Sequence, residues 1–168
     1  MLEEGTYYVL DVGEPDGDDV KSHAEQGATA TLEVSAGDDE AELPEVAASL
    51  EMNEYSFVPK GLKPGVNRFL LRNAGDELHH TLFVPIREGV PFAQVRKFVT
   101  SQGEGGGGPP PLDFTKLRGT TVLDGGREQI DQVELAAGRY AMLCFLTDRA
   151  GGPPHVAKGM VAELSIPG

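Results

Sequence analysis

Short apolar runs separated by turn-forming residues make up most of this chain. Runs of strand length that are bounded by Gly, Pro, Asn or Asp predict β-strands rather than helices. The predicted strands cover residues 6–10, 29–34, 48–52, 55–59, 65–73, 79–84, 127–135, 140–146 and 161–166. Many short strands with turn residues between them predict an all-β fold, in which two sheets pack around one core.

One segment departs from the strand pattern. Residues 90–99 have a proline near their start and apolar residues at three- and four-residue spacing, which predicts a short amphipathic helix. Phe92, Val95 and Val99 are expected on one face of this helix. A Gly/Pro-rich connector follows at residues 103–111. Together these segments predict an insertion at about residues 87–126, between two strands of the sandwich.

The strand predicted at residues 140–146 is apolar on both faces. Cys144 shares one face with Tyr140, Met142 and Leu146, because side chains alternate along a strand. The other face carries the apolar side chains of Ala141, Leu143 and Phe145. A strand buried on both sides needs a cover outside the sandwich, and we expect the inserted helix to supply it.

Composition limits the kinds of protein that this chain can be. Its 168 residues predict one domain, in which residues 1–47 add strands and acidic loops and residues 48–168 form the main sandwich. The net charge of −13 makes nucleic acid and anionic membranes poor partners, and it suits a basic protein partner or solubility in salt. No apolar run approaches the ~20 residues of a membrane helix, so no membrane span is predicted.

The single cysteine cannot form an intramolecular disulfide. In an exported protein a lone cysteine is expected to be a free thiol or a ligand. Residues 1–5 are acidic and lack the basic and apolar regions of a signal peptide. Two alternatives therefore stay open: a cytosolic protein, or an exported one whose leader is absent from this chain.

Four residues with metal-binding side chains fall near the ends of predicted strands. Cys144 lies near one strand end, and His155 follows a turn-rich loop at residues 148–154. Met160 comes after four further residues, and His79 starts a strand upstream. Two imidazoles, a thiolate and a weak axial thioether make up a blue-copper site. Cys144 and Met160 taken singly are more often core residues, so the order of all four residues carries the metal prediction.

The same residues resemble the cupredoxins, the plastocyanin-like family of blue-copper β-sandwiches. Residues 73–75, Asn-Ala-Gly, and residues 79–83, His-His-Thr-Leu-Phe, are similar to the family's Asn-Ala-Gly turn and its ligand strand, His-Asn-Val-Val-Phe. Cys144, His155 and Met160 are similar to the family's second ligand cluster. The resemblance covers about two thirds of the chain, from residue 48 to residue 167. It implies a Greek-key β-sandwich of seven or eight strands, here with a short inserted helix.

The resemblance also implies a cofactor and a function. It implies one type 1 copper site whose ligands are His79, Cys144, His155 and Met160. His80 points to the opposite face of its strand from His79, so we expect it, like Asn73, to support the site rather than to bind the metal. The implied protein carries single electrons between redox partners, without substrate chemistry. Its implied location is extracytoplasmic, either periplasmic or at the cell surface.

One spacing departs from the family pattern. Ten residues separate Cys144 from His155, whereas family members usually have two to four. The cost of loop closure grows slowly with length, so the loop can reach the same point, but we expect it to hold the imidazole less rigidly.

Three alternatives to an electron carrier stay open. They are a metal-free cupredoxin-like module that docks on a protein, a copper carrier or store, and a zinc site with a carboxylate as fourth ligand. No enzyme is predicted. Four histidines cannot supply the further copper centres of an oxidase, and Cys144 lies in an apolar strand rather than beside a general base.

Overall fold

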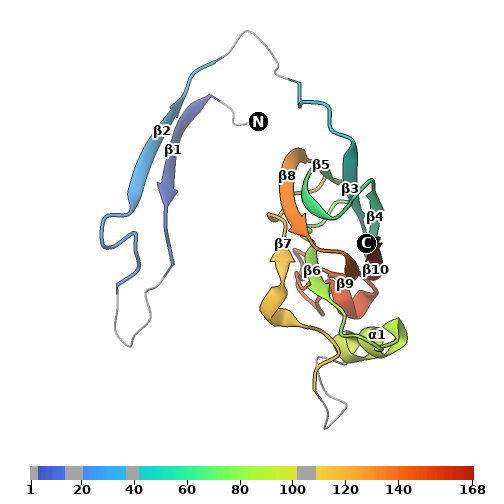
Figure 1. Cartoon of the computed structure of the whole chain (residues 1–168). Helices are drawn as coiled ribbons and strands as arrows, with labels where there is room; N and C mark the ends of the chain where they lie inside the picture. Colours follow the sequence, from blue (N-terminus) through green and yellow to red (C-terminus); the bar gives the residue numbers. More distant parts are fainter. Residues whose placement is uncertain (1–3, 14–20, 37–41, 102–108) are drawn as a thin grey trace. The chain divides into compact units, whose positions relative to one another are not determined.

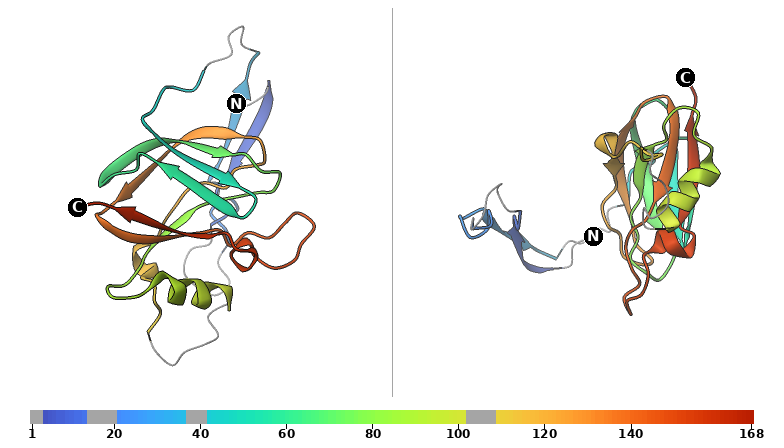
Figure 2. Two further views of the ribbon diagram at one scale, coloured as in Figure 1. Left: turned by 90° about the vertical axis from the view of Figure 1, so that its right-hand side faces the viewer. Right: turned by 90° about the horizontal axis from the view of Figure 1, so that it is seen from below.

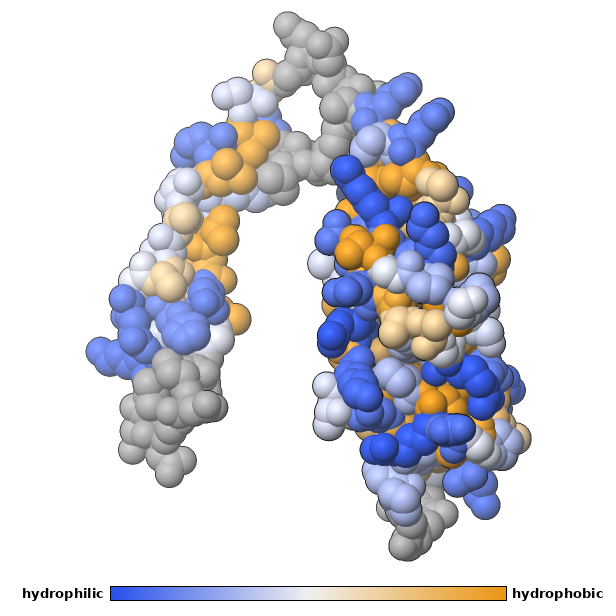
Figure 3. All heavy atoms as spheres, in the orientation of Figure 1, coloured by the Kyte–Doolittle hydropathy of each residue, from blue (hydrophilic) through white to orange (hydrophobic). Residues whose placement is uncertain are grey.

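The computed structural model describes residues 4–13, 21–36, 42–101 and 109–168. It divides into two compact units, Met1–Glu42 and Leu43–Gly168. In the first unit, β1 (Gly5–Leu10) and β2 (Thr29–Val34) form an antiparallel hairpin. Several large hydrophobic side chains of this hairpin are exposed: Tyr8, Val9, Leu10 and Leu32. Figure 3 shows hydrophobic residues, in orange, on the surface of this unit. The assignment of residues 1–47 to the domain of the sandwich stays a prediction.

The second unit is a sandwich of two four-stranded sheets in the described part of the chain (Figure 1). One sheet has the order β4-β3-β5-β8, formed by Ser56–Lys60, Ala48–Asn53, Gly65–Asn73 and Glu128–Leu135. The other has the order β10-β9-β6-β7, formed by Val161–Ile166, Gly138–Leu143, Leu82–Pro85 and Arg118–Gly119. Figure 2 shows the two layers from two further directions.

The connections between the sheets have the Greek-key character that the sequence predicts. β3 and β5 pair in parallel, so the chain must cross over between them, and β5 pairs antiparallel with β8. The chain passes to the second sheet between β5 and β6, returns to the first between β7 and β8, and crosses again between β8 and β9. The predicted all-β sandwich is therefore confirmed.

Alternation along the strands places the core between the sheets. In β3 the side chains of Ala48, Leu50 and Met52 are buried, while the residues between them are half-buried. Successive side chains of a strand point to opposite faces, so these three share the inner face. They pack with core residues from both sheets, including Phe57, Phe69, Leu71, Phe83, Val133, Leu135, Tyr140, Met142, Leu164 and Ile166.

The predicted helix is present as α1 (Phe92–Thr100), which begins after Pro91. Val95 and Val99 are buried, and they pack in a second apolar cluster with Ala141 and Leu143 of β9. The inserted segment thus covers the outer face of β9, as predicted. The prediction is wrong for Phe145, which is 40% exposed. Residues 102–108 of the predicted insertion lie outside the described residues.

Two predicted strands are shorter than the sequence pattern indicated. β6 begins at Leu82 rather than at residue 79, and β9 ends at Leu143 rather than at residue 146. His79 instead forms an isolated bridge with Leu123. The backbone groups of His79 and Cys144 lie outside these ladders and bond instead to Leu123 and Val156. No helix among the described residues is long and apolar enough to span a membrane.

Candidate metal centre

Three of the four predicted ligands meet inside the sandwich. His79 Nδ1 and His155 Nδ1 lie 3.1 Å apart. The Sγ of Cys144 lies 3.5 Å from His155 Nδ1 and 4.0 Å from His79 Nδ1. All three side chains are fully buried. Residues far apart in the sequence therefore bring two imidazole nitrogens and one sulfur to a single point without solvent.

His79 lies in the loop before β6 and is held by backbone hydrogen bonds to Leu123. The N–H of His79 donates to the carbonyl of Leu123 at 3.1 Å, and the N–H of Leu123 donates back at 2.8 Å. Asn73 strengthens this contact, because its amide donates to the same Leu123 carbonyl at 2.9 Å and to the carbonyl of Glu77 at 2.7 Å. The Asn73 side-chain oxygen accepts the N–H of Gly75 at 3.0 Å. Asn73 thus fastens the turn that delivers His79.

We expect Asn73→Ala to lower the free energy of unfolding by about 2–4 kcal/mol, since three largely buried hydrogen bonds are lost. Asn67→Ala is a matched control. Asn67 is also buried and also makes three bonds to its own turn, with Lys63 and Gly65. Urea unfolding is expected to show similar losses for both variants, whereas Cu(II) titration is expected to show weaker binding only for Asn73→Ala. Equal copper affinities would contradict a role of Asn73 at the site.

Cys144 follows β9 directly and faces the inner core. Burial raises the pKa of its thiol, while the backbone N–H groups of His80 and Leu146 favour the thiolate and act against that rise. A bound cation is therefore what would complete its ionisation, as coordinating thiols are deprotonated outright.

The long loop between Cys144 and His155 is anchored at several points. The N–H of His155 donates to the Leu146 carbonyl at 2.8 Å, and the N–H of Val156 donates to the Cys144 carbonyl at 2.9 Å. Within the loop, the N–H of Arg149 donates to the Glu77 carboxylate at 2.8 Å. The Arg149 guanidinium also pairs with Asp124. The extra residues are therefore tied to the turn that precedes His79.

Met160 and His80 are placed less directly at the cluster. Met160 is fully buried in the apolar cluster that contains Cys144, and its N–H donates to the His155 carbonyl at 2.9 Å. His80 is half-buried, and its Nε2 accepts the N–H of Phe145 at 3.2 Å. Burial and the nearby His155 lower the pKa of His80, which favours the neutral ring that this bond requires.

Sequence reasoning missed a polar group on the outer side of His155. The Nε2 of His155 lies 3.1 Å from a carboxylate oxygen of Asp148. Asp148 also pairs with the Lys158 ammonium and accepts the hydroxyl of Tyr55 at 3.0 Å. The one feature of the sequence that could have pointed to Asp148 is the unusual length of the loop between Cys144 and His155.

The distances among the three buried ligands fit a single metal ion. With bonds of ~2.0 Å to nitrogen and ~2.3 Å to sulfur, as zinc has, ligand atoms in a trigonal plane lie roughly 3.5–3.7 Å apart. The observed separations of 3.1, 3.5 and 4.0 Å bracket that range. The donor set of two imidazoles and a thiolate suits copper. A zinc site closed by a carboxylate is less well supported, since Asp148 binds the outer nitrogen of His155.

Hydrogen bonding alone does not satisfy the cluster. His79 Nε2 is buried and finds no partner among the described residues. Burial, and then the neighbouring His155, lower the pKa of His79, so the ring is held neutral. An unsatisfied buried polar group costs about 1–3 kcal/mol, and a metal held on Nδ1 would leave that cost in place.

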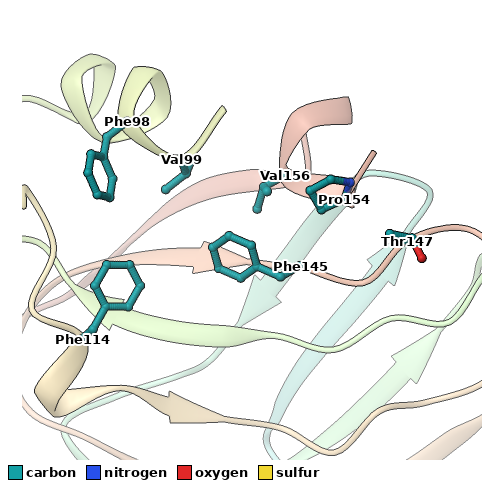
Figure 4. Close-up of a pocket in the computed structure, with 7 residues that line it drawn as sticks. All are labelled: Phe98, Val99, Phe114, Phe145, Thr147, Pro154 and Val156. Carbon is teal, nitrogen blue, oxygen red and sulfur yellow. The ribbon is translucent and has the colours of Figure 1, made fainter. Parts of the chain in front are cut away.

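A hollow of about 560 Å³ is lined in part by residues that are next to Cys144 and His155 in the chain (Figure 4). Its wall includes Phe145, which follows Cys144, and Pro154 and Val156, which flank His155. Phe98 and Val99 of α1 form the opposite wall, and Phe114 and Thr147 complete the lining. The chain segments that hold Cys144 and His155 thus reach a largely apolar surface that the insertion helps to build.

The fold and the site together define a β-sandwich with a buried His-Cys-His cluster, the arrangement implied by the resemblance to cupredoxins. Among solved structures, the chain is similar to dithionite-reduced auracyanin from the photosynthetic bacterium Roseiflexus castenholzii. That match has 22% identity and a TM-score of 0.43, and it covers 71% of this chain and 95% of the other. Auracyanin B matches at 19% identity with a TM-score of 0.45, covering 77% of this chain and 94% of the other.

These likenesses are weak, and they add nothing to what the sheets and the cluster show by themselves. No family model and no curated protein matches the chain.

Proposed function

We propose that this chain is a divergent cupredoxin that binds one copper ion and carries single electrons between protein partners. The proposed ligands are His79, Cys144 and His155, with Met160 as the weak axial ligand. The observation that carries the proposal is the convergence of two Nδ1 atoms and one Sγ, within 4.0 Å of one another, in a site closed to solvent.

Copper, when bound, supplies one-electron chemistry by alternating between Cu(I) and Cu(II). The chain supplies a fixed set of soft and imidazole ligands that suits both states. Backbone N–H groups of His80 and Leu146 stabilise the thiolate of Cys144, and the surrounding core excludes water. Such surroundings tune the reduction potential of a metal site. Phe145 leads from Cys144 to the surface, which offers a short covalent route for the electron.

Two features favour this proposal over its alternatives. A copper carrier must exchange its metal with a partner, whereas all four proposed ligands are buried. A metal-free docking module has no use for two buried imidazoles whose Nδ1 atoms face a buried thiol. The net charge of −13 supports a basic redox partner. We place the protein outside the cytoplasm, in the periplasm or at the cell surface, because that is where the resemblance locates it.

Adding Cu(II) to the wild-type protein is expected to produce an intense visible band at one copper per chain, from charge transfer out of the Cys144 thiolate. A hundredfold excess of copper over its dissociation constant is worth about 2.7 kcal/mol, or a rise of about 10 °C in Tm. Zn(II) is the control, since a d¹⁰ ion can bind without producing the band. A colourless protein with an unchanged Tm in Cu(II) would falsify the proposal.

A further inference from the structure

The outer edge of His155 is occupied by protein groups. Its ring is fully buried, and its Nε2 lies 3.1 Å from Asp148 Oδ1. The other Asp148 oxygen pairs with the Lys158 ammonium, and the ammonium also donates to the Tyr55 hydroxyl at 3.1 Å. An imidazole, a carboxylate, an ammonium and a phenol therefore form one connected group beside the proposed ligand.

The carboxylate determines where the imidazole keeps its proton. A neutral histidine has one N–H, and an ionised carboxylate can only accept a hydrogen bond. The bond to Asp148 therefore places the proton on Nε2 and leaves the lone pair on Nδ1, which faces Cys144 and His79. The Lys158 ammonium pairs with the other Asp148 oxygen, and a neighbouring positive charge favours the ionised, accepting form of the carboxyl.

A strained turn holds Asp148 in place. Tyr55, in the turn between β3 and β4, has φ of 61°, a left-handed conformation that is rare for a bulky residue. Its ring meets the His155 ring edge-on at 5.3 Å, and its hydroxyl donates to Asp148.

Glu54, the residue before Tyr55, contacts the turn that leads to His79, the other histidine of the proposed site. The Glu54 carboxylate accepts the N–H groups of Asp76 and Glu77, in the turn that leads to His79. One short turn thus braces both segments that deliver the imidazoles.

We propose that Asp148 is a positioning residue that fixes the orientation, the proton position and the donor strength of His155, and that Lys158 moderates its charge. A carboxylate bound to the outer N–H of a metal-ligating histidine raises the basicity of that ligand. This proposal rests on the proposed copper site for its effect on the metal. It also assigns a function to the long loop, because the extra residues after Cys144 include Asp148, which contacts the outer edge of the His155 ring.

The first test compares variants that change charge in opposite directions. In the copper-loaded protein, Asp148→Asn is expected to weaken Cu(II) about tenfold more than Cu(I), within the usual 10–100-fold cost of losing such a partner. A tenfold selective loss raises the one-electron reduction potential by about 59 mV. Lys158→Met is expected to lower the potential, because it leaves the Asp148 charge unopposed. Simple damage to the loop would not give shifts of opposite sign.

Glu163→Gln is the matched control, since it removes an acidic partner from an exposed ion pair with Arg139 on β9 and β10. It is expected to leave the potential unchanged, which separates the local effect of Asp148 from a change in net charge.

The second test needs no metal. NMR of the histidine ring nitrogens is expected to show His155 with its proton on Nε2 in the wild type and in Asp148→Asn, whose amide oxygen still accepts the bond. Asp148→Ala is expected to show a mixture of the two tautomers.

Unchanged potentials in Asp148→Asn and Lys158→Met, or a wild-type tautomer in Asp148→Ala, would overturn the role of Asp148. A wild-type protein that takes up no copper would overturn the proposed function instead, and the tautomer measurement would then decide this inference alone.

Discussion

Cys144→Ser is expected to abolish the visible band of the copper-loaded protein completely. Cys144 is the only cysteine of the chain, so no other thiolate can donate charge to the metal. A hydroxyl is too hard a ligand to replace it at a site with two imidazoles. Absorption spectra and metal analysis on the same samples are expected to show no band, and less than one copper per chain at copper concentrations that saturate the wild type.

A second serine variant separates the loss of the ligand from damage to the core. Ala141 lies in β9, the strand that ends just before Cys144. Its side chain is also buried, but it packs in the outer cluster with the residues of α1. Ala141→Ser places a hydroxyl in the core and is expected to lower stability while the band persists. A band that survives in Cys144→Ser would show that the absorption arises elsewhere.

Most of the sandwich was predictable because its strands obey local rules. The alternation in Ala48–Asn53 and Gly65–Asn73 puts apolar side chains on one face, and the structure shows the same faces buried. Residues 140–146 predicted a strand buried on both sides, which holds as far as Leu143. The amphipathic pattern after Pro91 likewise gave α1 and its buried face.

The ends of the ligand-bearing strands were not predictable in the same way. His79 and Cys144 continue apolar patterns, so periodicity alone extends the strands through them. In the structure their backbone groups bond to Leu123 and Val156, which lie 44 and 12 residues away along the chain. Such partners depend on how distant loops close, and no local pattern records them.

The contacts of Asp148 with His155, Tyr55 and Lys158 could not be predicted from the sequence for a related reason. Asp148 lies among turn-forming residues, where a carboxylate is usually solvated. Its contact with His155 exists only because the loop folds back, and its contact with Tyr55 joins residues 93 positions apart. The length of the loop predicts that it holds the imidazole less rigidly, and no pattern in the sequence predicts the contacts that tie it to Glu77, Asp124 and Tyr55.

The second large effect is expected from His79→Leu, which should remove copper binding without weakening the metal-free fold. His79 is fully buried, and its Nε2 finds no partner among the described residues. An apolar side chain of similar size removes this unpartnered nitrogen, but it also removes the 3.1 Å contact between His79 Nδ1 and His155 Nδ1. These effects oppose each other, so we expect the free energy of unfolding to change by less than about 1 kcal/mol. Urea unfolding without metal measures that change, and thermal unfolding with Cu(II) is expected to show none of the stabilisation seen for the wild type.

The adjacent histidine provides the control for this result. His80 accepts the N–H of Phe145, and His80→Asn keeps an acceptor at that position, so copper binding and stability are expected to stay close to the wild-type values. A loss of more than about 2 kcal/mol in metal-free His79→Leu would instead show that the imidazole serves the fold. Real proteins break the rules of core packing mainly at functional sites. A variant that folds as well as the wild type and no longer binds copper would therefore show that His79 is kept for the metal.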